Sequence, residues 1–217
     1  MWVPLHVHSQ YSILDASASV KGIAEKAASF GMPAVALTDH GNMFGVVEFF
    51  KACKSAGVKP ILGCEVYVAP QSRFHKKGER GERTAHHLTL LAKNDQGYHN
   101  LCKLSSIGYL EGFYYRPRID REVLEEYCEG LICLSGCMSS HVSQEALDGS
   151  RESLLQVIDW YQNIFGEDYY LELQRATMSE EDLHAEGMYQ ESWLHQLYQE
   201  TYSKREKINQ ALLEAGR

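Results

Sequence analysis

The sequence predicts an α/β fold in which a mainly parallel sheet closes into a barrel. Short apolar runs of strand type alternate with helical patterns, which is the order expected of repeated βα units with right-handed crossovers. The order helix, glycine, short spacer, proline and strand occurs twice, at Gly31-Met-Pro33 and at Gly57-Val-Lys-Pro60. Polar residues capable of chemistry lie near the strand ends, which favours a barrel over an open doubly wound sheet. No G-x-G-x-x-G loop follows the first strand, which argues against a Rossmann domain.

The individual elements follow from apolar periodicity and from helix cap and stop signals. The first helix has Ser17 or Ser19 as its candidate N-cap and Gly31 as its stop, and Gly57 ends the second helix. The expected strands cover residues 4–8, 33–38, 59–69, 87–92, 131–135 and 168–173. The expected helices cover residues 20–30, 43–56, 96–107, 139–148 and 150–164, with a charged helical segment over 179–215. About six βα units result, and the sequence ends where the last strand of a barrel is expected to begin.

Two segments interrupt this alternation of strands and helices. One is expected to form a mobile basic loop over residues 71–85, because it contains Arg73, Lys76, Lys77, Arg80 and Arg83. The other, residues 112–119, is irregular and aromatic. Residues 73–83 of the first segment and 114–118 of the second are candidates for contacting DNA through phosphate pairing and base stacking. The alternative is a solvated loop and a set of packed aromatic side chains.

The bulk composition restricts the class of protein. The chain has 217 residues and a formal net charge of −8, which argues against coating nucleic acid by bulk positive charge but leaves room for a local basic groove. No stretch is long and apolar enough to span a membrane, and the N-terminus lacks the pattern of a signal peptide. The six cysteines form no C-x-x-C pair, which favours reduced thiols in a cytoplasmic protein over a disulfide framework.

His6 and His8 are the first candidates for metal binding. They lie two residues apart on an expected strand, so both imidazoles point to the same face. Converging imidazoles suit Zn²⁺, Mn²⁺ or iron better than Mg²⁺ or Ca²⁺, which prefer oxygen ligands. An H-x-H pair is also found at the ends of ordinary surface strands, so the pair alone does not establish a metal site.

Further candidate ligands lie near the termini of the next four strands. They are Asp39, His40, Glu65, His86, His87 and Cys137. Strand ends that are distant in sequence meet at the mouth of a barrel, which predicts a metal centre there. Asp39 and His40 are adjacent, so both reach the site only if the chain turns at Gly41-Asn42. The alternative for Asp39 is a carboxylate that orients a ligating histidine, and only one of His86 and His87 is expected to bind metal.

Cations held by histidine and carboxylate can bridge a phosphate and activate a water molecule, so phosphoester hydrolysis is the expected reaction class. Five segments then carry a resemblance to a known family: LHVHSQYSILD, ALTDHGNMFG, KPILGCEVYVAP, HHLTLLAKN and LSGCMSS. They resemble the polymerase and histidinol phosphatase (PHP) domain. The segments TDHGNMFG and GFYYRPRID resemble the version of this domain at the N-terminus of the bacterial DNA polymerase III alpha subunit.

The resemblance implies a single PHP domain over residues 1–217, folded as a distorted (β/α)7 TIM-like barrel whose last strand lies beyond this sequence. It implies a cluster of up to three Zn²⁺ or Mn²⁺ ions. The implied metal ligands are His6, His8, Asp15, His40, Glu65, His87 and Cys137, and the implied catalytic residues are Asp15, Asp39 and His40. The family's closing Asp-x-His motif is absent. The sixth expected strand is followed by Gln174-Arg175, where the family often has His-Gly.

Three functions remain open at this stage. The first is a metal-dependent 3′–5′ exonuclease or phosphoesterase domain within a replicative DNA polymerase, whose nucleotide-adding site lies outside this chain. The second is an inactive scaffold that binds a separate proofreading exonuclease or other replisome subunits. The third is a free-standing histidinol-phosphate phosphatase. The expected partners are DNA and replisome subunits, with no membrane partner.

Overall fold

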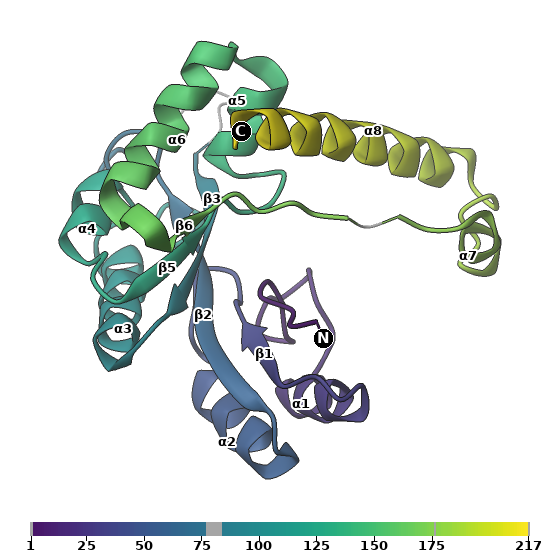
Figure 1. Ribbon diagram of the computed structural model, residues 1–217, viewed down its shortest axis with the longest axis horizontal. Helices are drawn as coiled ribbons and strands as arrows, with labels where there is room; N and C mark the ends of the chain where they lie inside the picture. Colours follow the sequence, from purple (N-terminus) through teal and green to yellow (C-terminus); the bar gives the residue numbers. More distant parts are fainter. Residues whose placement is uncertain (1, 77–83, 176, 217) are drawn as a thin grey trace.

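The computed structural model describes residues 2–76, 84–175 and 177–216, and it shows an α/β fold built on one six-stranded sheet (Figure 1). The strand order is β1-β2-β3-β5-β6, and β4 pairs with β2 beside this path. The strands are β1 (Ala34–Leu37), β2 (Lys59–Val68), β3 (His86–Ala92), β4 (Arg118–Ile119), β5 (Leu131–Leu134) and β6 (Tyr169–Tyr170). The α/β class is confirmed, and the sheet is not closed among the described residues.

The helices mostly lie where the sequence predicts them. They are α1 (Val20–Ser29), α2 (Val46–Ala56), α3 (Asp95–Leu110), α4 (Arg121–Glu126), α5 (His141–Asp148), α6 (Arg151–Phe165), α7 (Glu180–Ala185) and α8 (Ser192–Ala215). Ser19 is the N-cap of α1, because its side chain accepts a hydrogen bond from the Gly22 amide. Neither α4 nor β4 was expected. The segment 179–215 contains two helices, and in Figure 1 they extend away from the sheet.

The direction of β3 differs from the expectation of a mainly parallel sheet. β1 and β2 are parallel, whereas β3 runs antiparallel to both β2 and β5. The physical reason is the connection between β2 and β3, whose described part contains no helix. Parallel neighbours need a crossover of a dozen or more residues, usually through a helix, whereas a chain that returns without one pairs antiparallel. β1 pairs with residues 59–62 of β2 and β3 pairs with residues 63–68, so the two pairings meet in the middle of β2.

The N-terminal segment is extended but is not a regular strand, so this strand prediction was wrong in detail. The Ala36 amide donates to the Pro4 carbonyl at 2.9 Å, and the Thr38 amide donates to the Val7 carbonyl at 2.8 Å. Val7 in turn donates its own amide to the Thr38 hydroxyl at 2.8 Å. The segment therefore lies against β1, and this contact carries His6 and His8 towards the sheet.

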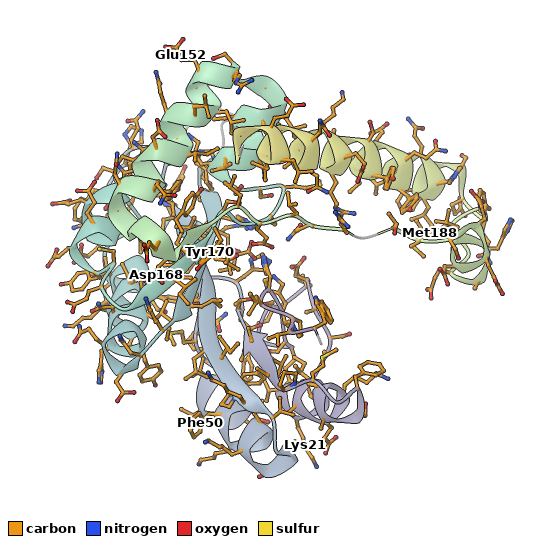
Figure 2. All side chains as sticks on the ribbon, viewed as in Figure 1. Lys21, Phe50, Glu152, Asp168, Tyr170 and Met188 are labelled. Atoms are coloured by element: carbon orange, nitrogen blue, oxygen red, sulfur yellow. The ribbon has the colours of Figure 1, made fainter. Side chains whose placement is uncertain are left out.

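Two main cores support the sheet, and a third, small cluster contains Ala36, Leu91 and Leu134. The smaller main core packs α1 and α2 against β1 through residues such as Ala24, Phe49 and Val35. The larger core lies around β2, β3 and β5 and includes residues of α3, α5, α6 and α8. In Figure 2 the side chains of α8 extend far beyond this core, and Met188, between α7 and α8, lies well away from Tyr170 of β6. All six cysteines are free thiols, and no helix of the described segments has the length and apolar character to cross a membrane.

The basic-loop prediction fails at Arg73, which is 9% exposed. Its guanidinium contacts Asp120 at 3.0 Å, Glu122 at 2.9 Å and Glu111 at 2.7 Å. Lys77, Arg80 and Arg83 lie outside the described residues. Since a buried guanidinium with three carboxylate partners is unavailable to phosphate, Arg73 stabilises the fold and is no part of a DNA-binding loop.

Replacing Arg73 with Met is expected to lower the free energy of unfolding by about 3 kcal/mol, because Asp120 would keep a buried charge without its main partner. Urea denaturation followed by circular dichroism measures this change. The matched control is Lys76→Met, at an exposed basic position in the same segment, with an expected change below about 0.5 kcal/mol. Equal effects of the two substitutions would contradict a structural role for Arg73.

Candidate metal centre

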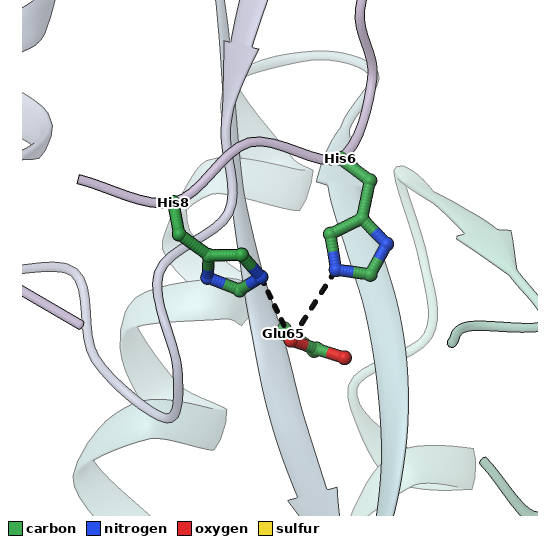
Figure 3. A group of neighbouring side chains, drawn as sticks. All are labelled: His6, His8 and Glu65. Carbon is green, nitrogen blue, oxygen red and sulfur yellow. Dashed lines mark ion pairs between the residues drawn. The ribbon is translucent and has the colours of Figure 1, made fainter. Parts of the chain in front are cut away.

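Glu65, in the middle of β2, is the central residue of the candidate site. It is fully buried, and its carboxylate contacts four imidazoles. One oxygen, Oε2, lies 3.2 Å from His6 Nε2, 3.1 Å from His8 Nε2 and 2.9 Å from His40 Nδ1. The other oxygen, Oε1, lies 3.0 Å from His87 Nδ1. Figure 3 shows His6 and His8 pointing from one chain segment towards the Glu65 carboxylate.

The backbone explains how these histidines converge. His6 and His8 are two residues apart on the extended segment beside β1, so their side chains share a face. His40 follows β1 and forms an isolated parallel bridge with Glu65. His87 lies on β3, where it is the register partner of Tyr67 on β2. Three neighbouring segments of chain therefore bring their imidazoles to one point of β2.

Gly41 allows the turn that the sequence required after His40. Its φ is 63°, a left-handed conformation that side chains rarely adopt. A Cβ atom at this position would lie 2.8 Å from Pro117 and 2.9 Å from the Tyr67 ring. Despite this turn, the side chains of Asp39 and His40 point apart, and only His40 reaches Glu65.

Asp39 lies behind the site, with 1% of its surface exposed. Its carboxylate accepts hydrogen bonds from the Ser9 amide at 2.6 Å, from the Ser9 hydroxyl at 2.7 Å and from the Ser12 hydroxyl at 2.7 Å. Ser12 Oγ in turn lies 3.1 Å from His8 Nδ1 and accepts the His40 amide at 3.1 Å. Asp39 therefore orients the segment that carries the histidines, which matches the alternative considered for it from the sequence.

Asp15 and Cys137 lie at the edge of the cluster. The Asp15 carboxylate contacts His40 Nε2 at 2.7 Å, and its side chain is 59% exposed. The Cys137 sulfur lies 3.4 Å from His87 Nδ1. Burial raises the pKa of the Cys137 thiol, so in the absence of a cation this residue is protonated. His86, in contrast, stacks on the His141 ring at 4.5 Å and points away from Glu65.

Glu172 is a site residue that the sequence analysis missed. Its carboxylate contacts His6 Nδ1 at 2.7 Å and accepts a hydrogen bond from the Gln174 amide group at 2.8 Å. Thr89 is a second neighbour, with its hydroxyl 3.3 Å from the same His6 nitrogen. Like Glu65, Glu172 is a single acidic residue in an apolar strand-like run, and this pattern could have identified it from the sequence. Gln174, which stands where the family often has histidine, therefore supports Glu172 through this hydrogen bond.

The electrostatics of the cluster are dominated by Glu65. Burial on its own would raise the pKa of a carboxyl group, but hydrogen bonds from the four histidines hold the pKa of Glu65 well below its usual range. For His6 the effect of burial has the opposite sign and would lower the pKa. Contacts with Glu172 and Glu65 outweigh it and raise the pKa of His6 to about 10. The pKa of His40 is raised against burial by Glu65 and Asp15. His6 therefore carries a proton at neutral pH that a binding cation would have to displace.

The donor atoms fit a site for more than one borderline cation. Three groups hold one donor atom per residue with all donors within 4.8 Å of one another: His6, His8 and Glu65; His8, Asp15 and His40; and His40, Glu65 and His87. Imidazole and carboxylate donors in this mixture suit Zn²⁺ or Mn²⁺. Because neighbouring groups share His8, His40 or Glu65, cations bound there would lie side by side.

Comparisons with known proteins identify the family to which the chain is similar. A family model described as the PHP domain matches residues 4–176. The chain is 54% identical over 216 residues to a DNA polymerase III subunit alpha of Chlamydia pneumoniae, covering 100% of this chain and 17% of that protein. It is 50% identical over 182 residues to the same subunit of Borreliella burgdorferi, covering 84% of this chain and 16% of that protein. The chain thus spans about one sixth of the length of these relatives.

Among solved structures, an amidohydrolase from Chromobacterium violaceum overlaps 49% of this chain and 33% of its own, with 25% sequence identity and a TM-score of 0.36. An overlap of this size supports no inference about function.

In the metal-free protein, the free energy of unfolding is expected to decrease on the order of 2 kcal/mol as the pH rises from 6.5 towards 10. The raised pKa of His6 means that its stabilising contribution is complete below the ordinary histidine value of 6.5 and is lost near 10. The contribution of Glu65, whose pKa is lowered, is present above 4.5 and is lost in acid. Urea denaturation in chelator over this pH range measures the slope. The Glu65→Gln variant should show a much smaller slope, and an unchanged slope would contradict the assignment.

Replacing Asp39 with Asn is expected to cost about 2 kcal/mol of stability, because three buried donors point at the two oxygens of this carboxylate and one of those oxygens would become a donor itself. Thermal and urea unfolding of the variant measure the loss. Ser140→Ala is the control, since Ser140 is an equally buried polar residue outside this hydrogen-bond network that caps α5. Its expected cost is about 1 kcal/mol. A smaller loss for Asp39→Asn than for this control would contradict a supporting role for Asp39.

Proposed function

The chain belongs to the PHP domain family, and we propose that it forms the N-terminal, metal-dependent phosphoesterase domain of a bacterial DNA polymerase III alpha subunit. The proposed reaction is hydrolysis of the terminal phosphodiester of a DNA strand in the 3′–5′ direction. The names of the relatives and their sequence identities to this chain support the proposal that the parent protein is a DNA polymerase III alpha subunit. Its polymerase activity, its replisome partners and its cytoplasmic location belong to this proposal, and no residue of this chain is assigned to nucleotide addition.

The observation that carries the proposal is the convergence of four imidazoles on the buried Glu65 carboxylate. A purely structural carboxylate rarely recruits four histidines from three segments, since one or two ordinary donors satisfy its oxygens. The proposed metal ligands are His6, His8, Asp15, His40, Glu65, His87 and Cys137. Glu172 joins them as the group that orients His6.

Bound Zn²⁺ or Mn²⁺ would supply charge neutralisation for a phosphate and would lower the pKa of a water molecule. The protein's own contribution begins with Asp15, whose exposed carboxylate faces solvent and is hydrogen-bonded to His40. The other oxygen of this carboxylate would accept the proton of the attacking water and return it to the leaving oxygen, while His40 orients Asp15. Asp39, predicted to be catalytic, is proposed instead to hold Ser9 and Ser12, and through them His8 and His40.

An inactive scaffold that binds a proofreading exonuclease is the alternative most easily tested against this proposal. A scaffold needs no exposed proton acceptor at its metal centre, and the accessibility of Asp15 favours the enzyme. Hydrolysis of histidinol phosphate, the third possibility, would require a pocket that closes around a small substrate. The cleft next to Asp15 is open and is lined by aromatic side chains.

The direct test is release of nucleotides from a 3′-labelled DNA strand by the purified chain. The protein is stripped with chelator and reloaded with Mn²⁺ or Zn²⁺, and bound metal is quantified by elemental analysis. Activity should appear only after reloading and should fall at least about 100-fold in Glu65→Gln, since the central donor is lost. The His184→Asn variant is the matched control, because His184 lies on α7 outside the cluster.

Full metal occupancy without release of nucleotides would favour the scaffold. Selective turnover of histidinol phosphate would favour the small-molecule phosphatase. Hydrolysis of p-nitrophenyl phosphate without hydrolysis of DNA would retain the phosphoesterase chemistry and reject the proposed substrate.

A further inference from the structure

A cleft of about 1020 Å³ opens beside the metal centre. Asp15, His40 and His87 line its inner wall, so it is continuous with the proposed catalytic residues. Its outer wall has a different character and consists of aromatic residues from three segments: Phe44, Tyr109, Phe113 and Tyr115. The cleft therefore joins a polar, metal-binding end to an aromatic end.

The aromatic wall is accessible to solvent. Phe44 is 65% exposed, Phe113 is 48% exposed and Tyr115 is 82% exposed. The rings lie near one another without closing the space between them: Phe44 and Tyr109 have centroids 5.9 Å apart, and Tyr109 and Phe113 have centroids 6.2 Å apart. Four partly exposed aromatic side chains around one cleft are unusual for a surface without a ligand, because they expose apolar area that folding normally buries.

Backbone strain is found at the same cleft. Leu14 and Tyr115 are the non-glycine residues of the described segments with positive φ, at 71° and 59°. Both line the cleft, and both side chains project into solvent, Leu14 being 103% exposed. A left-handed bulky residue costs free energy that the surrounding structure must offset, and such residues cluster at ligand sites. The left-handed backbone at these two positions directs the side chains of Leu14 and Tyr115 to the cleft instead of to the core.

One positive charge faces this space. Arg116 is the only Arg or Lys among the described residues that line the cleft. Its guanidinium lies over the Tyr67 ring at 4.8 Å, and Tyr67 packs edge-on against His87 with centroids 5.0 Å apart. Arg116 is therefore held between the metal centre and the aromatic wall. The nearby Arg118, by contrast, is buried and donates to backbone carbonyls.

We propose that the aromatic wall stacks the unpaired terminal bases of a single-stranded DNA end, while Arg116 pairs with a backbone phosphate next to the metal centre. Aromatic rings stack on any base, and a guanidinium matches phosphate geometry, so this pairing selects single strands without selecting sequence. Bases inside a duplex are stacked on each other and cannot reach the wall. The inference rests on the proposed function, because it places the scissile end of the substrate at Asp15 and His40.

Binding of a short fluorescent oligothymidylate to the metal-free chain, measured by anisotropy in chelator, tests this proposal without turnover. Phe113→Leu keeps an apolar side chain but removes the ring, and Tyr115→Asn fits the left-handed backbone. Each variant is expected to weaken binding about 10-fold, and Arg116→Gln by a similar factor with a weaker salt dependence. A blunt duplex of the same length should compete poorly.

Phe50→Leu and Lys54→Gln are the matched controls. Phe50 is 43% exposed on α2, and Lys54 lies over its ring at 5.6 Å, so this pair repeats the aromatic and basic chemistry outside the cleft. Both control variants should bind the oligonucleotide as the unmodified chain does. Thermal melting of every variant shows whether a loss of binding reflects a loss of fold.

The two proposals fail in different ways. Unchanged oligonucleotide affinity in the folded cleft variants would overturn the stacking site and leave metal-dependent hydrolysis untouched. Binding that depends on the cleft, in a protein that hydrolyses nothing, would reject the enzyme and retain the stacking site. If the cleft variants kept their DNA affinity but lost binding to another replisome protein, the wall would be a protein-docking face and the proposal would be overturned.

Discussion

The buried carboxylate of Glu65 is the constraint on which the rest of the site depends. A charge in the interior of a sheet is stable only when it is fully paired, and here the pairing comes from four histidines on three chain segments. This requirement links the N-terminal segment, the turn after β1 and the start of β3 to the middle of β2. The point at which these segments meet β2 is thus also the site at which the chemistry of the protein is proposed.

A second layer of hydrogen bonds fixes the orientation of these histidines. Asp39 holds Ser9 and Ser12, Ser12 contacts His8 and His40, and Glu172 holds His6 from the opposite side. None of these contacts needs a cation, so the histidines are oriented before any ion is bound. The same contacts favour protonated histidines, and proton release is therefore part of the energetics of metal binding in this protein.

The fold also separates two kinds of basic residue that look alike in the sequence. Arg73 and Arg118 are buried and hold the chain that connects β2 with β3 and α4, through carboxylates and backbone carbonyls respectively. Arg116 instead remains at the surface beside Tyr67. One aromatic and basic segment thus serves both stability and the lining of the cleft, although regular strand geometry would place Arg116 and Arg118, two residues apart, on the same face.

The sequence by itself determined the α/β class, most helices and strands and the histidines that surround Glu65, because apolar periodicity and the spacing of His6 and His8 are local properties. It could not determine that β3 runs antiparallel, that Arg73 is buried or that Glu172 contacts His6, since each depends on which distant segments become neighbours. Asp39 and His40 show the limit most clearly. They are adjacent in the sequence, yet hydrogen bonds to Ser9 and Ser12 hold Asp39 behind the site, and pairing with Glu65 on β2 holds His40 within it.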